Sequence, residues 1–559
     1  MANQIEGPAV RLDLAVTTSQ RELSNEGLLM LSFRLYLTDI DTSCWSWTTD
    51  RWVCGRSWIK PLANPTLVSQ LACDQSGRAS LFVRECNDGI QRPRVEPATQ
   101  TLSNAGSLIS GMSGWQVDFV TVELQPGAIR IAVGEHGTAP LYLATGRGML
   151  AGSWNLPELR EFFDPSDLLE RAVVRALTRQ PRYTSDTLFR GVKQLTERAM
   201  ATFTRHGLEI AYPEPAHHVL AARQPRAGVD LVAAFHELLT VVTTAVAAGP
   251  GDVGVELSGG ADSANVALAV STVRDDAVRS YGLVVDGKVG MQQRIRRDVL
   301  VRRLGFTDVA ISAGVHPPFA PDGVRALGLP HDPCSAYYRE AFDRMRDVVA
   351  EHETRVIFTG LGGDELNALH PHERPGDSTP AEYHSIPWLG SRVHAAMADV
   401  DTNLAPVSAV PLPTLMAFRL HHPAYLAAGI WPKAPLAHPM IGRFAEQLPL
   451  ELRKGKSLFR ERLRRAGFAN EIADPRRPEN FRALMQHGLR RYGMPMLERM
   501  LEESTLTDAG YLDRRALHAA WQAAKTAEPI PSILCDAIAV ERGVQTLRNA
   551  AHPAAATID

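Results

Sequence analysis

The sequence predicts a chain of two halves, an α+β half followed by an α/β half built on a doubly wound parallel sheet. In residues 28–212 the pattern favours short strands between turns that carry glycine or proline, with one helix-like insert at 166–179. Beyond the proline-containing segment 212–216, helical patterns alternate with short buried strands, which is typical of βαβ units. We therefore place the boundary between the two halves after residue 215.

The elements follow from apolar periodicity. In the first half the clearest strands are expected at 29–36, 119–124 and 129–133. In the second half the expected order is a helix at 229–247, a strand at 253–257, a helix, a strand at 280–285, a helix at 294–304, a strand at 309–312, a helix at 336–351 and a strand at 356–359. Residues from about 400 onward are expected to be helical, with no further strand.

A glycine-rich run, Ser258-Gly-Gly-Ala-Asp-Ser263, joins the strand expected at 253–257 to a helix of small residues. Gly259 and Gly260 allow a tight turn that exposes backbone N–H groups, and the helix N-terminus adds partial positive charge. The two serines can donate hydroxyls to phosphate oxygens, and Asp262 can hold the Mg²⁺ that accompanies ATP. No GK[ST] follows, so this is not a Walker A loop. It predicts the pyrophosphate loop of enzymes that cleave ATP to AMP and pyrophosphate.

A second glycine-rich turn, Gly360-Leu-Gly-Gly-Asp-Glu365, follows the strand expected at 356–359. In a parallel sheet the loops after the strands share one edge, where ligands bind. Asp262 and Asp364 are therefore expected to hold one Mg²⁺ between them, bridging the ATP phosphates.

Composition narrows the class of protein. The 559 residues are 45% hydrophobic and 22% charged, with a net charge of −3, which argues against a general nucleic-acid surface. No apolar run reaches the about 18 residues that a membrane span needs, and the start lacks the features of a signal peptide. The six cysteines show no CxxC spacing and favour free thiols. We expect a cytoplasmic protein without nucleic-acid or membrane partners.

Together the two loops resemble those of the asparagine synthetase family, whose synthetase half carries SGGxDS and an SGxGxDE-type loop. Segments 133–142, 187–195 and 455–460 are also similar to stretches of that family. The resemblance covers most of the chain. It implies a degenerate Ntn-type glutamine amidotransferase-like α+β domain at 1–215, and an asparagine-synthetase-like ATP-pyrophosphatase domain with extra helices at 216–559.

The resemblance also implies the roles of individual residues. ATP would contact Leu257, Ser258, Gly259, Gly260, Asp262, Ser263, Leu283, Gly360 and Gly362, with Mg²⁺ on Asp262 and Asp364. The expected catalytic residues are Asp262, Asp364, Glu365 and Lys456, and the expected substrate contacts are Tyr337 and Leu361. Glu365 and Glu340 are both candidates for the general base, and each could equally be solvated or paired with an arginine.

Three departures from the family bear on function. Glutamine-hydrolysing members use a cysteine at position 2, where this chain has Ala2, and a methyl group cannot replace a thiolate. Leu361 stands where asparagine synthetases carry a Glu associated with aspartate activation, which makes free aspartate a poor substrate. The family lysine near 474–481 is missing, with Arg476 or Arg477 as its replacement.

A synthetase without its own ammonia source must take the amine from its substrate. Lasso peptide cyclases do this, and the chain resembles them most, in its divergent N-terminal domain and in segment 435–449, which leads into Lys454-Gly-Lys456. That resemblance implies a ribosomal precursor peptide as partner, and allows a leader peptidase and a leader-recognition protein. The alternatives are a β-lactam or carbapenam synthetase, an ammonia-dependent asparagine synthetase, and a non-catalytic peptide-binding scaffold.

Overall fold

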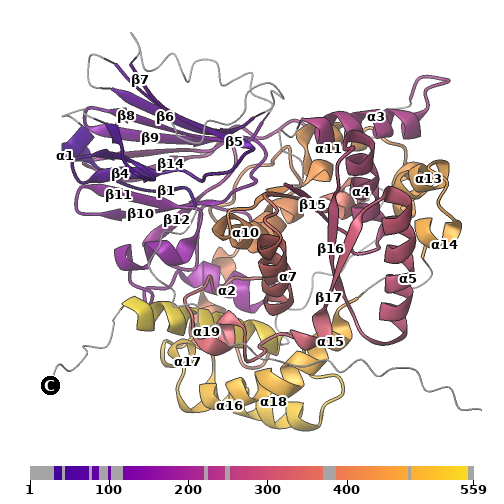
Figure 1. The fold of residues 1–559 in the computed structure, drawn as a ribbon. Coiled ribbons are helices and arrows are strands. Elements are labelled where there is room, and N and C mark those ends of the chain that lie inside the picture. Colours follow the sequence, from indigo (N-terminus) through magenta and orange to yellow (C-terminus); the bar gives the residue numbers. More distant parts are fainter. Residues whose placement is uncertain are drawn as a thin grey trace, which may run out of the picture.

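The computed structural model describes residues 30–40, 45–74, 78–86, 98–101, 117–218, 225–245, 252–368, 386–475 and 480–551. Within these ranges the chain is a mixed α/β protein with two seven-stranded sheets and one five-stranded sheet (Figure 1). The two larger sheets belong to the first half of the chain and lie stacked, while the smaller sheet belongs to the second half.

The N-terminal sandwich, our name for residues 30–211, consists of these two stacked sheets. The first has the order β12 (Val192–Leu195), β10 (Leu141–Gly146), β11 (Met149–Ser153), β1 (Ser32–Tyr36), β4 (Ser57–Lys60), β3 (Trp52–Cys54), β2 (Ser46–Trp47). The second has the order β14 (Gly207–Ala211), β13 (Met200–Thr204), β9 (Ala128–Val133), β8 (Phe119–Gln125), β6 (Ala79–Glu85), β5 (Leu67–Cys73), β7 (Ala98–Thr101). Every pairing is antiparallel except that of β5 with β7. The described helices of this half are α1 (Leu37–Ile40), 3-10 helix η3 (Leu156–Phe162) and α2 (Glu170–Leu177).

Alternation along β10 shows how the first sheet is buried on both faces. Leu141 and Leu143 point into the core between the sheets. Tyr142 and Ala144 point the other way, into a second core that α2 shares with helices near the end of the chain. Those helices are α16 (Met494–Glu502), α17 (Thr505–Asp508), α18 (Arg514–Thr526) and α19 (Leu534–Ala551). The two halves of the chain therefore share one hydrophobic core, while the expected boundary at residue 215 stays a prediction.

The five-stranded sheet is parallel throughout, in the order β17 (Thr307–Ser312), β16 (Arg279–Val284), β15 (Val253–Glu256), β18 (Val356–Phe358), β19 (Trp431–Lys433). One face is covered by α3 (Leu231–Thr244), α4 (Ala261–Val273), α5 (Gly287–Leu304) and α13 (Ser457–Arg465). The other is covered by α7 (Arg339–Glu351) and α10 (Leu412–Ala427). Strands β16 and β17 lie on one side of β15, and the later strands β18 and β19 lie on its other side. The topological switch point therefore lies between β15 and β18.

Two predictions about this half are wrong. A strand does occur after residue 400, because β19 pairs with β18 at the edge of the sheet. Pro432 in its middle lacks an N–H, which an edge strand tolerates. Helix α5 begins at Gly287 rather than at 294, because residues 287–293 carry two glycines and three polar side chains instead of an apolar stripe.

The remaining described helices connect these layers. They are α6 (Val324–Leu327), α8 (Gly363–Leu366), α9 (Ser391–Ala395), α11 (Pro439–Ala445), α12 (Leu450–Arg453), α14 (Asn470–Ala473) and α15 (Arg482–Gly488), with 3-10 helices η4 (Ala313–Val315), η7 (Met397–Asp399), η8 (Pro435–Ala437) and η9 (Lys454–Lys456) and the π-helix η10 (Leu489–Gly493). No helix in the described part of the chain is both long enough and apolar enough to cross a membrane. Among the described cysteines, Cys54, Cys334 and Cys535 are free thiols.

Candidate functional site

The loop after β15 is held in shape by its own two serines. The backbone N–H of Ser258 donates to Ser263 Oγ at 3.1 Å, and the two hydroxyl oxygens lie 3.1 Å apart. Gly260 N–H in turn donates to Ser258 Oγ at 3.1 Å. Gly259 adopts φ +92°, a conformation that L side chains rarely take. The loop thus turns sharply and starts α4 at the switch point.

The loop after β18 packs directly against the first loop through its glycines. A Cβ on Gly360 would lie 2.9 Å from Ser263 N, and one on Gly363 would lie 2.5 Å from Asp262 Cγ. Gly362 adopts φ +94°, and its Cβ would lie 2.9 Å from Ala437 N. Because the approaches at Gly360 and Gly363 exclude a side chain, these two glycines allow the two loops to meet, and Gly362 allows the second loop to pack against η8.

Lys456 joins the two loops electrostatically. Its Nζ lies 2.6 Å from Asp262 Oδ2 and 2.6 Å from Asp364 Oδ1. The backbone of Lys456 is left-handed, with φ +59°, which costs a non-glycine residue about 1 kcal/mol or more. That strain is kept because helix α13 is tied to α4: the buried Asn265 donates to Phe459 O at 3.2 Å and accepts through its backbone carbonyl from Arg462 at 2.8 Å.

The environment of the two carboxylates fits a divalent cation. Burial raises the pKa of Asp262 to about 6, against the opposing effect of the Lys456 ammonium. Asp262 Oδ1 is buried without a hydrogen-bond partner among the described residues, whereas the Asp364 side chain is 81% exposed. Within the described ranges no group of three or more His, Cys, Asp or Glu could hold a metal alone. Two carboxylates would therefore need oxygen ligands from the phosphates to complete the coordination of Mg²⁺.

The two candidate general bases differ in their surroundings. Glu340 is buried and paired with Arg325, which donates from Nε to Oε1 at 2.7 Å and makes a second contact to Oε2. A carboxylate held in this way is structural, so the structure does not favour Glu340 as a base. Glu365 lies at the site, where its charge helps to raise the pKa of Asp262.

The two expected substrate contacts lie in different places. Leu361 packs against the apolar cluster of Tyr183, Val410, Leu415, Phe418 and Ala437. Tyr337 lines a cavity of about 310 Å³ between α2, α10 and α19, with the Arg179 guanidinium 5.1 Å from its ring centroid. Met416 lines that cavity and packs against the same cluster as Leu361, so it links the two.

Two residues of α5 support the first loop and were missed in the sequence. Gln293 Nε2 donates to Ser258 O at 2.9 Å and to Leu283 O at 2.8 Å, and its Oε1 accepts from Val285 N. Arg296 Nε donates to Gly259 O at 3.3 Å. Both are buried on the inner face of α5. The sequence signal for these two residues is a pair of polar side chains on the buried face of a helix. It was missed because the predicted helix began at residue 294, after Gln293.

The structure therefore brings Asp262, Asp364 and Lys456 together, next to the backbones of both loops. Leu257 lies at the foot of the first loop, where its N–H donates to Tyr281 O at 2.7 Å. Ala2, Arg476 and Arg477 lie outside the described residues.

Comparisons with known proteins give only distant matches. No protein-family model matches the chain, and no curated protein matches it in sequence. Among solved structures, the allosteric regulatory enzyme of purine biosynthesis matches 48% of this chain and 68% of its own, at 10% identity and a TM-score of 0.19. Glutamine phosphoribosylpyrophosphate amidotransferase from B. subtilis, complexed with ADP and GMP, matches 70% of this chain and 87% of its own, at 9% identity and a TM-score of 0.19. Scores of this size assign neither a fold nor a function.

Proposed function

We propose that the chain is an ATP-dependent, AMP-forming carbon–nitrogen ligase that closes a macrolactam on a ribosomal precursor peptide, as lasso peptide cyclases do. One observation carries the proposal: two glycine-rich loops at the switch point of a parallel sheet bring two carboxylates and a lysine into direct contact. A site of this composition suits the triphosphate of ATP, because backbone N–H groups and an ammonium favour the phosphates.

In the first step, an Asp or Glu side-chain carboxylate of the peptide attacks the α-phosphorus of ATP. The α–β phosphoanhydride bond breaks, pyrophosphate leaves and an acyl adenylate forms. Ser258, Ser263 and the loop N–H groups orient the phosphates, and Lys456 stays beside the departing pyrophosphate. When bound at Asp262 and Asp364, Mg²⁺ would neutralise charge on the phosphates.

In the second step, the peptide's own α-amine attacks the acyl carbon, AMP leaves and the amine loses a proton. Glu365 is the carboxylate available at the site for that proton. Holding both reacting groups on one folded peptide replaces a bimolecular encounter, an effect worth roughly 7–11 kcal/mol. The apolar packing of Leu361 disfavours the charged α-ammonium of free aspartate, so a peptide side chain is the better acyl donor.

Mass spectrometry with ATP and Mg²⁺ tests the proposal. The substrate is a linear peptide with a free N-terminus and an internal Asp or Glu. We expect loss of one water from the peptide with an equal amount of AMP, and neither product with Asp262→Ala. AMP only with aspartate and ammonia would assign the protein to the asparagine synthetases, and AMP only with a small β-amino acid would favour a lactam synthetase. Peptide binding unchanged by Asp262→Ala, without AMP, would favour a scaffold.

A further inference from the structure

The edge strand β19 is held by a side chain of the N-terminal sandwich. Glu85 at the end of β6 accepts from Trp431 Nε1 at 2.7 Å, and Lys433 Nζ lies 2.8 Å from each of its two oxygens. Glu85 is 5% exposed. Trp431 also packs into the core of the sandwich and contacts Trp154, with ring centroids 5.7 Å apart. The strand therefore belongs to the parallel sheet by its backbone and to the sandwich by its side chains.

A second residue of the sandwich holds the start of the same strand. Asn64 Nδ2 donates to Gly429 O at 3.0 Å, just before β19, and to Arg355 O at 2.9 Å, just before β18. Its Oδ1 accepts from the Thr66 N–H and hydroxyl, which fixes the orientation of the amide. Asn64 is buried, so these bonds are shielded from water. We call Asn64 and Glu85 the β19 clamp.

The strand held by this clamp leads directly to the second glycine-rich loop. Lys433 O accepts from Thr359 N at 2.7 Å, one residue before Gly360. After β19 the chain reaches Ala437, whose backbone lies so close to Gly362 that a Cβ on Gly362 would be 2.9 Å from Ala437 N. The loop that carries Asp364 is thus in contact with both ends of segment 433–437, which begins at Lys433, a residue held by the clamp.

We infer that Asn64 and Glu85 are positioning residues for the loop at 360–365, and that the N-terminal sandwich serves to fix this loop against Asp262 and Lys456. The expected fall in kcat rests on the proposed function. The positioning of the loop by Asn64 and Glu85 rests on the contacts alone.

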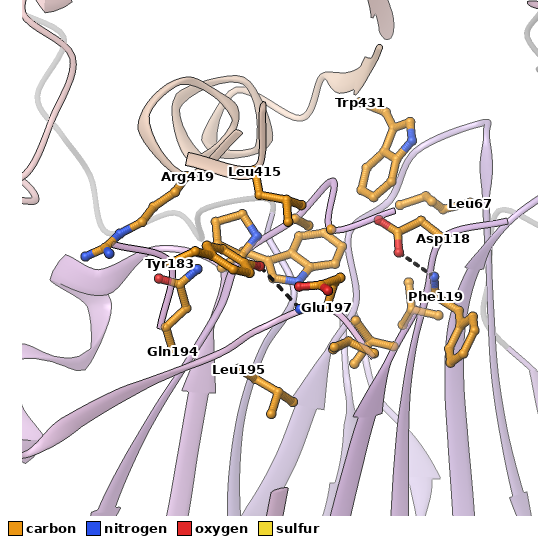
Figure 2. A pocket seen from close by; sticks show the side chains of 17 residues that line it. Leu67, Asp118, Phe119, Tyr183, Gln194, Leu195, Glu197, Leu415, Arg419 and Trp431 are labelled. Atoms are coloured by element: carbon orange, nitrogen blue, oxygen red, sulfur yellow. Dashed lines mark hydrogen bonds between the residues drawn. The ribbon is translucent and has the colours of Figure 1, made fainter. Parts of the chain in front are cut away.

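Glu85 is the charged member of the β19 clamp, and its carboxylate is the counter-ion of Lys433. Burial raises the pKa of the Glu85 carboxyl, but the charge of Lys433 and the hydrogen bonds from Lys433 and Trp431 lower it overall. Figure 2 shows Trp431 near Asp118 and Leu67 at the cavity between the sandwich and α10. Asp118 N–H approaches Glu85 Oε2 at 3.4 Å, so the network continues into the sandwich. Removing the charge at Glu85 leaves the Lys433 ammonium without its counter-ion in a confined position.

Glu85→Gln tests the inference, because it keeps the shape of the side chain and removes its charge. A loop displaced by about 1 Å can cost about 100-fold in rate. We therefore expect kcat for AMP formation to fall by about 10- to 100-fold. The KM for ATP should change little, because the β15 loop remains in place. Asn64→Asp, which places a carboxylate against two carbonyl oxygens, should act in the same direction.

The matched control is Glu541→Gln. Glu541 is equally buried and accepts from Ser504 Oγ at 2.8 Å, Thr505 N at 2.7 Å and Leu506 N at 2.9 Å, but it contacts no part of β19. If Glu541→Gln lowers kcat per folded molecule as much as Glu85→Gln does, the clamp is merely structural and the inference fails.

Hydrogen–deuterium exchange of the full chain separates the inference from the proposed function. In Glu85→Gln and Asn64→Asp we expect faster exchange over 359–366 and unchanged exchange over α16, without any substrate. Faster exchange in a protein that has no activity even as wild type would sustain the clamp and remove the proposed function. Unchanged exchange over 359–366 in both variants would overturn the clamp, whatever the activity.

Discussion

Gly363→Ala is the most direct perturbation of the contact between the two loops. The new Cβ would lie 2.5 Å from Asp262 Cγ, 2.7 Å from its Cβ and 2.8 Å from its Oδ1. Carbon atoms in contact prefer about 3.5–4.0 Å, so Asp262 or the loop must move by about 1 Å. The backbone of Gly363 is helical at the start of α8, so the added methyl group perturbs the site by its contacts and not by its conformation.

Two effects of different size follow from this movement. Overpacking of this kind costs about 1–3 kcal/mol of stability, which leaves a large protein folded. Displacing a catalytic group by about 1 Å costs about 100-fold in rate. We therefore expect kcat for AMP formation to fall by about 100-fold while most of the protein remains folded.

The assay follows AMP and pyrophosphate at saturating ATP, with the folded fraction taken from circular dichroism. Gly442→Ala in α11 is the control, because its Cβ would meet no heavy atom closer than Ala409 O at 3.4 Å. It should keep wild-type activity. If Gly363→Ala retained kcat within about threefold of wild type, the loop contact would not define the geometry of the site, and the reasoning from the 2.5 Å approach would be wrong.

Three further predictions address charge. Lys456→Met should lower kcat by about 10²–10³-fold, whereas Lys454→Met on the same turn should leave it unchanged. If both variants released AMP at the same rate, the role of Lys456 would be contradicted. Burial raises the pKa of Glu256 to about 7, so the folded state binds this proton more tightly and stability falls as pH rises from 4.5 through 7. Glu256→Gln should therefore be more stable than wild type at pH 8 by about 3 kcal/mol, with little difference at pH 4.5, in urea unfolding. Glu340→Gln should cost about 3–5 kcal/mol of stability by leaving Arg325 buried and unpaired, with unchanged kcat per folded molecule; a lost kcat would make Glu340 the base.

Local sequence was enough to predict the central strands and the two loops. The segments that form β15, β16 and β18 are rich in buried apolar residues and end in recognisable turns. Both the apolar pattern and the end of each strand can therefore be read from the sequence. The positions of Asp262 and Asp364 follow from those two loops. In contrast, β19 has three residues, too few to establish any period, and its pairing depends on the neighbour that β18 provides.

Contacts between distant segments could not be predicted. Glu85 and Lys433 are separated by 348 positions, and neither stands in a motif. The same holds for the ion pair of Arg325 with Glu340, which turned a candidate base into a structural group. Tyr337 was placed by resemblance, but its neighbours come from α2 and α19 as well as from its own segment.

The shared core of α2, β10 and α19 has a consequence for synthesis of the chain. Tyr142, Ala144 and Val192 are completed by Val544 and Leu547. A ribosome adding about 5–20 residues per second needs roughly 20–70 s to travel the about 350 residues between Val192 and Leu547. Throughout that interval the apolar sheet face lacks the part of its helical cover that α19 supplies. A nascent chain of this protein is thus a natural client for chaperones that shield apolar surface, and it completes its first half only when α19 has left the ribosome.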